Sequence, residues 1–484
     1  MQVFRDDRAT KWVLVAALSG LLTAGGVAAY ADDPGGASAS TGRSGACAEL
    51  PTSGEPPQLP APTRTTVDTL RQAYDCILDN AYAGSALDTR VMLRDGFKAA
   101  TEELIRRGRD QPTATLAGLT GHRKRDWDRF AATMQTVLNA VSGDEAARQA
   151  VAGAALTGMV ASLGDNHAGW ESRRVPPQSG PQYSYGFREG VSGRPTRNIQ
   201  DATPPFYVDL LRAGGPADQA GLKRGDILVA ANDVPLVSNG MLNGGVLGDL
   251  HAAKATDTLR LTVTRPATGA TWTVTLHAET VTPTAPAVEA TLLPGGIAKV
   301  TVPAFAPGAA DAALGKIAEL RTTTTLRGIV FDVRGNGGGR AEEVGKLISS
   351  FVHGKVIARD CDIRNRCTDD RTDDTVPLLG LPMTVLTNGL CASACEGFTG
   401  AVKYLGIGKV IGTRTAGAAS GLQRAYLLND NSVLVMPKYY RFVGDDAMVD
   451  EIGVPADFEI PLTAEDLSFG RDPALDKARE LLAG

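Results

Sequence analysis

The spacing of hydrophobic residues changes twice along the chain, and this change constrains the fold more than any other feature. Over residues 65–163, large apolar residues recur every three or four positions, which predicts amphipathic helices. Over residues 183–281, short apolar runs separated by Gly, Pro and Asn predict strands and turns. From Ala285 onward, predicted strands alternate with predicted helices. Because 484 residues exceed what one hydrophobic core usually supports, the sequence predicts an α+β multidomain protein.

These changes define the expected domain organisation. The stretch from Asp32 to Thr63 is rich in Gly, Ser, Pro and Ala and poor in large apolar residues, which is typical of a disordered linker. We therefore expect a signal peptide at 1–31, a disordered linker at 32–63, an N-terminal helical region at 64–180, a β-domain at 181–282 and a core domain at 283–484.

The first thirty residues have the pattern of a targeting segment. Three basic residues precede an apolar run at 12–30, and the run ends in the cleavage-type sequence Ala29-Tyr30-Ala31. The pattern predicts export to a secreted or extracytoplasmic location. The run is close to the lower limit for spanning a bilayer, so an uncleaved anchor is the alternative, and membrane contact is expected only in that case.

Composition and motifs exclude several classes of partner and cofactor. A net charge of −5 without a sustained Lys/Arg block gives no electrostatic footprint for nucleic acid. The glycine-rich stretch from Gly335 to Arg340 has Arg340 where a dinucleotide motif has its third glycine, and no G-K-[ST] follows. No histidine lies near a cysteine pair, as a common zinc site would need. We expect no cofactor and no metal.

Six cysteines in an exported chain predict disulfide bonds. Cys361 and Cys367 bracket a short polar stretch typical of a hairpin tip, and Cys47 and Cys76 could tie the N-terminal tail to the first helix. A third pair, Cys391 and Cys395, flanks Ser393, although the helical i, i+4 spacing is poor disulfide geometry. Connectivity stays open at this stage.

The segment "TNGLCASACEGF", residues 387–398, holds the serine of greatest interest. It follows a predicted apolar strand and begins a predicted helix. Ser393 and Glu396 satisfy the S-x-x-E capping box, which is a purely structural role. The same position places a hydroxyl beside unpaired N–H groups at the positive end of a helix dipole, which favours an anionic intermediate. The motif alone allows both a cap and a nucleophile.

Within the β-domain, "GPADQAGLKRGDILVAANDVPL" at 215–236 resembles the core of a PDZ domain. The sequence "SYGF" at 184–187 resembles the loop with which such domains bind a carboxylate. The resemblance implies that backbone N–H groups of Tyr185, Gly186 and Phe187 capture a peptide C-terminus while the peptide adds to the sheet as a strand. The expected partner is a polypeptide with a C-terminal tail.

Four ordered motifs, with the PDZ-like segment upstream, resemble the C-terminal processing (tail-specific) serine peptidases and their tricorn-core relatives. The motifs are "FDVRGNGGG" at 331–339, "TNGLCASACEGF", "VIGTRTAG" at 410–417 and "GVPADFEI" at 453–460. The similarity extends from Thr65 to Leu482. It implies a crotonase-like or ClpP-like α/β core and a nucleophilic role for Ser393. The N–H of Ala394, with that of Gly337 or Gly338, would form the oxyanion hole.

A serine hydroxyl needs a base, and the base expected from the processing peptidases is absent. Those enzymes carry a lysine in a T-x-G-K-G segment, where this chain has Thr415-Ala-Gly-Ala418-Ala419. The tricorn-like branch uses a histidine from the upstream helical region, which resembles His167 preceded by Asn166. An imidazole with a pKa near 6.5 can accept the hydroxyl proton at neutral pH. A structural role for His167 at its Gly-Asp turn is the alternative.

The acid that would orient this histidine has two candidates. The resemblance places an acidic residue three positions before Gly453, which is Asp450, and the neighbouring Glu451 has the side-chain length of the tricorn branch. Both could also form a solvated pair. The sequence therefore predicts an exported serine endopeptidase that cleaves unstructured or C-terminal segments of proteins. The alternative is a catalytically inactive, PDZ-containing relative that only binds peptides.

Overall fold

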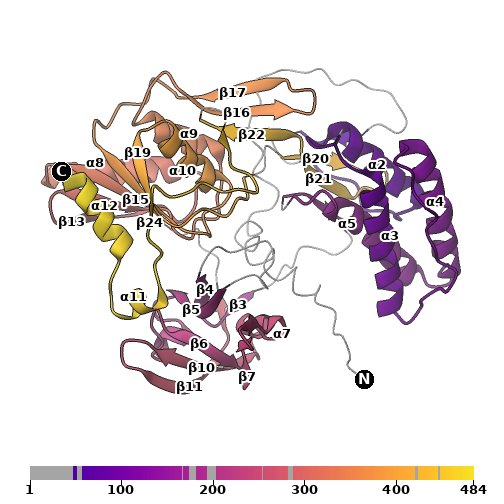
Figure 1. Ribbon diagram of the computed structural model, residues 1–484, viewed down its shortest axis with the longest axis horizontal. Helices are drawn as coiled ribbons and strands as arrows, with labels where there is room; N and C mark the ends of the chain where they lie inside the picture. The colour runs from indigo at the N-terminus through magenta and orange to yellow at the C-terminus, as the bar shows by residue number, and fades with distance from the viewer. Residues whose placement is uncertain are drawn as a thin grey trace.

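The computed structural model describes residues 47–51, 57–84, 86–165, 167–173, 181–192, 203–252, 254–281, 287–419, 423–444 and 447–483. The chain forms a helical region, a β-domain and a large α/β core, which lie at three corners of the molecule (Figure 1). This mixed architecture confirms the predicted fold class. The expected signal peptide at 1–31 and Asn166 lie outside the described residues. No helix in the described part of the chain is long and apolar enough to cross a membrane.

Four helices pack around one apolar core in the N-terminal region. Each begins at a residue whose side chain accepts a backbone N–H of the first turn, because such caps satisfy otherwise unpaired donors; these residues are Thr66, Asp88, His122 and Asp144. The helices are α2 (Val67–Asn80), α3 (Thr89–Arg106), α4 (Arg123–Ala140) and α5 (Glu145–Ala161). Their shared core includes the fully buried Leu70, Phe130 and Leu156.

A hairpin from the C-terminal half of the chain completes this helical region. Strands β20 (Gln423–Leu427) and β21 (Val433–Pro437) contribute the buried Tyr426, Leu434 and Met436 to the helical core. The hairpin lies between two short strands of the N-terminal half, in the order β1 (Ala48–Glu49), β20, β21 and β2 (Gly169–Glu171). Figure 1 shows the orange hairpin against the indigo helices. The helical region is therefore not built from contiguous sequence.

Part of the expected disordered linker at 32–63 is ordered, which corrects that prediction. Strand β1 pairs with β20, and a disulfide joins Cys47 to Cys76 of α2, with 5.6 Å between their Cα atoms. The Thr63 N–H donates to the Asp430 carbonyl at 2.8 Å. Composition gave no sign of this order because the residues that pair with β1 and Thr63 lie more than 360 positions away.

The β-domain is an antiparallel sheet with its core on one face. The strand order is β11 (Ala270–His277), β10 (Thr258–Arg265), β6 (Ile227–Ala231), β5 (Thr203–Leu211) and β4 (Phe187–Ser192), with β7 (Val234–Pro235) beside β6. Short helices α6 (Pro216–Gln219), α7 (Gly244–Leu247) and η2 (Gly248–Leu250) accompany the sheet. Two small pairs are β3 (Gln182–Ser184) with β12 (Glu279–Val281), and β8 (Val237–Ser238) with β9 (Met241–Leu242). Strand β4 lies at the edge of the main sheet.

The core domain is built on a mostly parallel sheet covered on both faces. Its strand order is β13 (Glu289–Leu293), β14 (Ile297–Thr301), β15 (Gly328–Asp332), β18 (Met383–Thr387), β19 (Gly408–Gly412) and β24 (Phe458–Glu459), and only the β13 pairing is antiparallel. Helices α8 (Ala309–Thr323), α9 (Ala341–Ser349) and α10 (Ala394–Tyr404) pack on one face, and α12 (Pro473–Ala483) packs on the other. Burial on both faces explains the continuous apolar run of β15.

A second, smaller sheet and a short helix complete the core domain. The sheet has the order β17 (Cys367–Arg371), β16 (Val356–Asp362), β22 (Tyr439–Val443) and β23 (Ala447–Met448). A disulfide joins Cys361 and Cys367 across the β16–β17 hairpin. Helix α11 (Ala464–Ser468) connects the core sheet to α12 and contacts β5 of the β-domain.

The parallel arrangement positions the candidate site. The glycine-rich loop follows the carboxyl end of β15, and the turn that carries Ser393 follows the carboxyl end of the adjacent β18. Carboxyl ends of neighbouring parallel strands meet at the same edge of a sheet, where ligands bind in open α/β folds. The fold therefore brings two motifs together that lie more than fifty residues apart.

Because the β20–β21 hairpin belongs to both the helical region and the core domain, its apolar side chains should stabilise the helical region strongly. Leu434→Ala should lower the free energy of unfolding by about 2–5 kcal/mol, since it removes a fully buried side chain. Leu378→Ala is the control, because Leu378 is 52% exposed. Thermal unfolding followed by circular dichroism measures both; equal transitions for the two variants would contradict the packing role of the hairpin.

Candidate active site

Ser393 lies at a strained turn between β18 and α10. It is the N-cap of α10, with φ 54° and ψ −120°, a conformation that L-residues other than Gly, Asn and Asp rarely adopt. Such strain costs on the order of 1–3 kcal/mol and persists only where the surroundings fix the backbone. The disulfide between Cys391 and Cys395 closes this turn, with 5.4 Å between the Cα atoms. All three disulfides considered from the sequence are therefore present.

Backbone hydrogen bonds hold the strained turn in place from both sides. The Ser393 N–H donates to the Ala418 carbonyl at 2.9 Å, and the Ala416 N–H donates to the Cys391 carbonyl at 2.9 Å. The Ala392 N–H donates to the Asn336 carbonyl of the glycine-rich loop at 3.1 Å. The turn is thus tied to the loop before it and to the segment after β19.

Glu396 does more than cap a helix. Its side chain is fully buried and accepts four hydrogen bonds. Oε1 accepts from the Thr415 hydroxyl at 2.5 Å and the Gly417 N–H at 2.7 Å. Oε2 accepts from the Ala418 N–H at 2.6 Å and the Ser393 N–H at 3.2 Å. One carboxylate therefore joins the candidate nucleophile to the segment where the processing peptidases carry their lysine.

The capping box predicted for Ser393 and Glu396 is present. Within it, the contact between the Glu396 N–H and the Ser393 hydroxyl does not have full hydrogen-bond geometry. The Glu396 N–H donates instead to the Ser393 carbonyl at 2.8 Å. Burial raises the pKa of Glu396 to about 7, although the hydrogen bonds from Thr415, Gly417, Ala418 and Ser393 act in the opposite direction. The carboxyl therefore titrates close to neutral pH.

The glycine-rich loop presses against Ser393. Gly338 has φ 112°, and a Cβ at this position would lie 2.8 Å from Ser393 Cβ and 2.9 Å from the Ala392 carbonyl oxygen. Only glycine fits this approach. The buried Asn336 side chain shapes the loop, since its Nδ2 donates to the Val302 carbonyl at 2.8 Å.

The predicted oxyanion-hole donors differ in their availability. The Gly338 N–H donates to Asn336 Oδ1 at 2.8 Å and is already engaged. Among the described residues, no hydrogen bond from the Gly337 N–H is found. Ala394 is the first residue of α10, a position whose N–H has no partner within the helix. The geometry favours Ala394 and Gly337 over Gly338.

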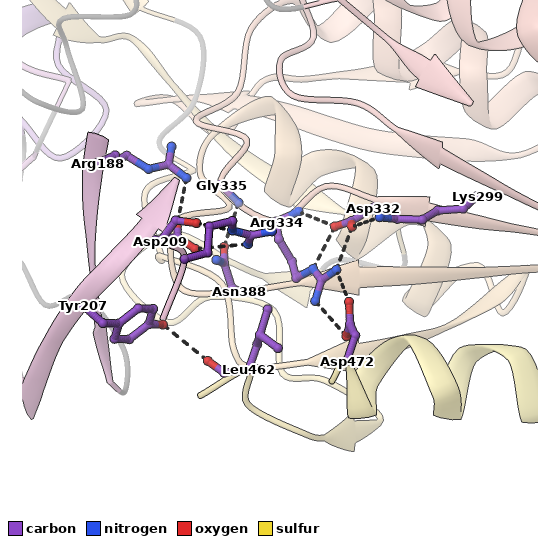
Figure 2. A network of polar contacts seen from close by, with 11 residues as sticks. Arg188, Tyr207, Asp209, Lys299, Asp332, Arg334, Gly335, Asn388, Leu462 and Asp472 are labelled. Atoms are coloured by element: carbon purple, nitrogen blue, oxygen red, sulfur yellow. Dashed lines mark hydrogen bonds and ion pairs between the residues drawn. The ribbon is translucent and has the colours of Figure 1, made fainter. Parts of the chain in front are cut away.

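Asn388 links the glycine-rich loop to the turn that carries Ser393. Its Oδ1 accepts the Gly335 N–H at 2.9 Å and the Leu390 N–H at 3.1 Å (Figure 2). The asparagine of the Asn-Gly turn therefore has a structural role that its turn propensity does not reveal, because one side chain fixes the start of the glycine-rich loop relative to the nucleophile turn.

A buried ion-pair network supports the same loop. Arg334 forms paired hydrogen bonds with both Asp332 and Asp472, and Lys299 contacts Asp332 at 3.1 Å (Figure 2). Burial alone would raise the pKa of Asp332, but Arg334 and Lys299 outweigh it and lower this pKa to about 2. The network fixes the end of β15 to the start of α12.

The β-domain contacts the glycine-rich loop directly. Arg188 of β4 donates to Asp209 of β5 at 2.8 Å, and its guanidinium lies against Gly335, where a Cβ would be only 2.6 Å from Nη2 (Figure 2). The Tyr207 hydroxyl donates to the Leu462 carbonyl at 3.3 Å. One face of the β4–β5 pair therefore packs on the candidate active site.

The lysines nearest in sequence are engaged elsewhere or exposed. Lys403 pairs with Asp457 at 2.6 Å, Lys438 pairs with Glu49 at 2.6 Å, and Lys409 is exposed on β19. Ala418 occupies the position of the lysine in the processing peptidases, and its carbonyl accepts the Ser393 N–H. The described contacts give no lysine base for Ser393.

His167 lies at the turn between α5 and β2. Its side chain is 17% exposed, its N–H donates to Asp165 Oδ1 at 2.7 Å, and its Nδ1 is 4.0 Å from the same oxygen. Strand β2 pairs with β21 with Gly169 opposite Val435, and β21 pairs with β20 with Pro437 opposite Gln423. Continuing this register, His167 lies at the end of the sheet where β20 begins.

The two acidic candidates differ in their surroundings. Asp450 is buried, and its Oδ1 accepts the Ala419 N–H at 3.0 Å. Glu451 is exposed, has φ 63° and donates its N–H to the Gly417 carbonyl at 2.9 Å. Burial raises the pKa of Tyr440 to about 12, with further contributions from the charges of Asp450 and Glu451. Both acids therefore lie beside the segment that Glu396 holds.

The SYGF loop of the β-domain has a sharp turn at Gly186, with φ 83°. The Gly186 N–H donates to the Ser184 hydroxyl at 2.9 Å, and the Gly186 carbonyl accepts the Arg212 N–H at 2.8 Å. Tyr185 is buried, and Phe187 packs against the domain core. Of the three N–H groups expected to bind a carboxylate, the Gly186 N–H already donates a hydrogen bond to Ser184.

Family models match two parts of the chain. Residues 296–460 match peptidase family S41, and residues 207–265 match the PDZ domain. With the core sheet and the serine turn described above, these matches identify a domain of the peptidase S41 type at residues 296–460, with a PDZ domain before it.

Curated relatives agree with this assignment. The chain is 32% identical over 161 residues to tricorn protease homolog 1 of Streptomyces coelicolor, covering 33% of this chain and 14% of the relative. It is 30% identical over 271 residues to the chloroplastic C-terminal processing peptidase of Tetradesmus obliquus, covering 51% and 55%. The chain therefore spans about one seventh of the tricorn relative and about half of the processing peptidase.

Two solved structures share the fold. The photosystem II D1 C-terminal processing protease has a TM-score of 0.50 at 19% identity, covering 86% of this chain and 96% of that chain. Mature CPAF has a TM-score of 0.51 at 12% identity, covering 87% and 97%. At these identities the likeness concerns the fold alone.

Sequence reasoning missed two residues of this site. It assigned Glu396 a capping role, whereas the carboxylate also holds the 415–418 segment. It assigned nothing to Arg188, which lies against Gly335. Glu396 carried a signal in its capping motif, but the contact of Arg188 depends on how two domains dock and has no local pattern.

Gly338→Ala should disable the site without unfolding the chain. The new Cβ would overlap Ser393 Cβ and the Ala392 carbonyl, which would displace the oxyanion loop, and loss of one oxyanion donor typically costs about 10²–10³ in rate. The rate of Ser393 labelling by a fluorophosphonate should fall by roughly 100-fold. Gly397→Ala on α10, with no atom within 4 Å of its Cβ, should label normally. Normal labelling of Gly338→Ala would contradict this geometry.

Glu396→Gln should weaken the turn because the amide nitrogen would face N–H or O–H donors whichever way it points. A buried donor left unsatisfied costs about 1–3 kcal/mol, so the melting temperature should fall. Because burial raises the Glu396 pKa from 4.5 to about 7, the folded state holds this proton more tightly. The associated stability is present below pH 4.5 and is lost as pH rises through 7, by about 3 kcal/mol.

Urea unfolding of wild type and Glu396→Gln between pH 4 and 8 measures this effect. The difference between the two free energies of unfolding should change over this window and stay constant above it. A difference independent of pH would show that Glu396 does not titrate near neutrality.

Proposed function

We propose that the chain is an exported serine endopeptidase that cleaves unstructured or C-terminal segments of proteins, with Ser393 as nucleophile. The observation that carries the proposal is the strained φ of Ser393 at the start of α10, with the Ala394 N–H next to it in the chain and the glycine-rich loop packed against it at Gly338. A nucleophile at such a turn stands next to donors for an oxyanion. The S41 family match supports the same reaction class.

In the proposed reaction, His167 removes the Ser393 proton as Oγ attacks the carbonyl carbon of the scissile peptide bond. The N–H groups of Ala394 and Gly337 stabilise the negative charge on the carbonyl oxygen. The imidazolium then gives its proton to the leaving amine, and water hydrolyses the acyl-enzyme by the reverse sequence of proton transfers. No cofactor takes part in these steps.

The strand register supports His167 as the base. The sheet end where His167 lies is the end where Gln423 begins β20, only four residues beyond Ala419. Ala419 and Ala418 contact Asp450 and Ser393 respectively. The β20–β21 hairpin therefore connects, along the chain and through its strand pairing, the segment that ends at Ala419 beside Ser393 with the sheet that carries the histidine turn.

Asp450 is the better candidate for the acid that orients the imidazole, because it is buried beside this segment whereas Glu451 is exposed. A buried carboxylate stabilises an imidazolium more strongly than a solvated one. Asn166 retains its proposed place next to His167, as the small polar residue of the tricorn-like branch.

Export and tail capture are part of the same proposal. Three disulfides, with no free cysteine among the described residues, suit an oxidising compartment. The PDZ domain presents the open edge of β4 and the Tyr185–Phe187 loop, where a peptide C-terminus can add as a strand. The Gly186 N–H becomes available for a carboxylate when the Ser184 hydroxyl turns away.

Fluorophosphonate labelling and cleavage of casein test the proposal. Ser393→Ala should abolish labelling, and His167→Ala should lower it by about 10²–10⁴, the usual contribution of a general base. Lys409→Ala should label normally, because that side chain is exposed on β19. Ala418→Lys in the His167→Ala background should restore part of the labelling, since the Ala418 carbonyl already contacts Ser393.

Normal labelling of His167→Ala would exclude it as the base. A wild-type protein that neither labels nor cleaves, yet binds peptides, would instead establish the alternative of an inactive peptide-binding relative. The absence of a lysine at position 418 is the observation that keeps this second function in view.

A further inference from the structure

Strand β4 of the PDZ domain carries two different sets of side chains on its two faces. Arg188 and the Cα of Gly190 face Asp209 and Tyr207, on the side that packs on the core domain. Phe187 and Val191 face the PDZ core. Glu189 lies between them in sequence and contacts His251, directly after η2, at 3.3 Å. Glu189 therefore projects from the face of the PDZ core, where an added peptide strand would place alternate side chains.

One buried oxygen of the Glu189 carboxylate has no hydrogen-bond partner. Oε1 contacts His251 Nε2, whereas Oε2 is buried and has no hydrogen-bond partner. The Glu189 side chain is 18% exposed and that of His251 is 43% exposed, so the pair lies at the margin of the domain and not in its centre. A buried acceptor without a partner costs about 1–3 kcal/mol, which a ligand donor would relieve.

The surrounding charges favour a cation. Burial would raise the pKa of Glu189, but the hydrogen bond and charge of His251, the backbone N–H of Glu189 and the charge of Arg188 together outweigh it and lower this pKa, which favours the ionised carboxylate. The carboxylates of Asp249 and Asp257 also act on the neighbouring Tyr185 and add negative charge to this end of the domain. Arg188 faces the other side of the strand and is bound to Asp209.

The register of an added strand indicates which ligand residue would reach Glu189. A tail whose carboxylate lies at the Tyr185–Phe187 loop runs antiparallel to β4, and its last and third-last side chains share one face. The last side chain lies beside Phe187 and the apolar core. Two positions further along β4 is Glu189, opposite the third-last residue.

We propose that Glu189, positioned by His251, is a specificity-determining residue that selects tails with Lys or Arg at the third position from the C-terminus. This inference rests on the proposed function, because it assumes that the open edge of β4 captures substrate tails. It goes beyond that function by naming the chemistry of the tail.

The test measures binding separately from cleavage. The full-length Ser393→Ala protein is titrated into fluorescein-labelled decapeptides that differ only at the third-last residue, which is Lys, Ala or Glu. A fourth peptide carries Lys at the second-last position, where the side chain faces the other way. The third-last Lys peptide should bind about five- to tenfold tighter than the Ala peptide and tighter still than the Glu peptide, as expected for a charge-assisted hydrogen bond.

Glu189→Gln in the same background should remove the preference for the Lys peptide over the Ala peptide. In NMR spectra of histidine-labelled protein, the imidazole titration of His251 should move to lower pH when the Lys peptide is bound, because a second cation shares the carboxylate. A purely structural Glu189–His251 pair would show neither effect. The peptide series on the protein that carries only Ser393→Ala decides the question even if the additional Glu189→Gln substitution prevents folding.

Equal affinities for the Lys, Ala and Glu peptides would overturn the inference, as would a preference for Lys that persists in Glu189→Gln. If no peptide with a free carboxylate binds, while wild-type protein still cleaves casein, then tail capture and the inference both fail and the peptidase activity stands. If the preference is present but wild-type protein does not cleave, the inference holds for an inactive binding protein.

Discussion

The candidate site depends on one buried carboxylate. Glu396 accepts hydrogen bonds from Ser393, Thr415, Gly417 and Ala418, so it fixes the nucleophile turn to the segment that follows β19. The strained backbone of Ser393 needs such constraint, because an isolated turn of this sequence would relax to a conformation with negative φ. The Cys391–Cys395 disulfide adds a covalent restraint across the turn at residues 391–395, which contains Ser393.

The lysine of the processing peptidases and the histidine of the tricorn branch are alternative solutions to one chemical requirement. Position 418 is adjacent to Ser393 through its carbonyl, so a lysine there would reach the site from within the core domain. With alanine at 418, a base has to come from elsewhere. The β20–β21 hairpin carries the chain from this segment into the helical region, beside the strand that follows His167. This contact of the hairpin is consistent with the proposed role of His167 as base.

Strand β4 relates peptide capture to catalysis. On one face of β4, Arg188 contacts Gly335 at the start of the glycine-rich loop. On the other face, Glu189 contacts His251 near the edge where a tail would add. Because the two faces belong to one short strand, a peptide that orders the edge also acts on the residues that contact the core domain. The proposed selection of substrate tails would therefore take place on the strand that also contacts the glycine-rich loop.

The sequence by itself predicted the architecture and pointed to Ser393 as the candidate nucleophile. Helical spacing, strand alternation and four ordered motifs predicted the three-part fold, the PDZ domain, the serine turn and the glycine loop beside it, because each of these depends on residues that are close in sequence. Only the tertiary structure decided that Glu396 holds the 415–418 segment and that residues of the expected linker are ordered. The structure also decided that the Gly338 N–H donates to Asn336, whereas no hydrogen bond from the Gly337 N–H is found among the described residues. It also decided that a hairpin of the core completes the helical region. The pairing of β1 and the packing of the hairpin join segments hundreds of residues apart. The hydrogen bonds of Glu396 and Gly338 depend on how the loops fold back on themselves, and neither kind of contact leaves a period in the sequence.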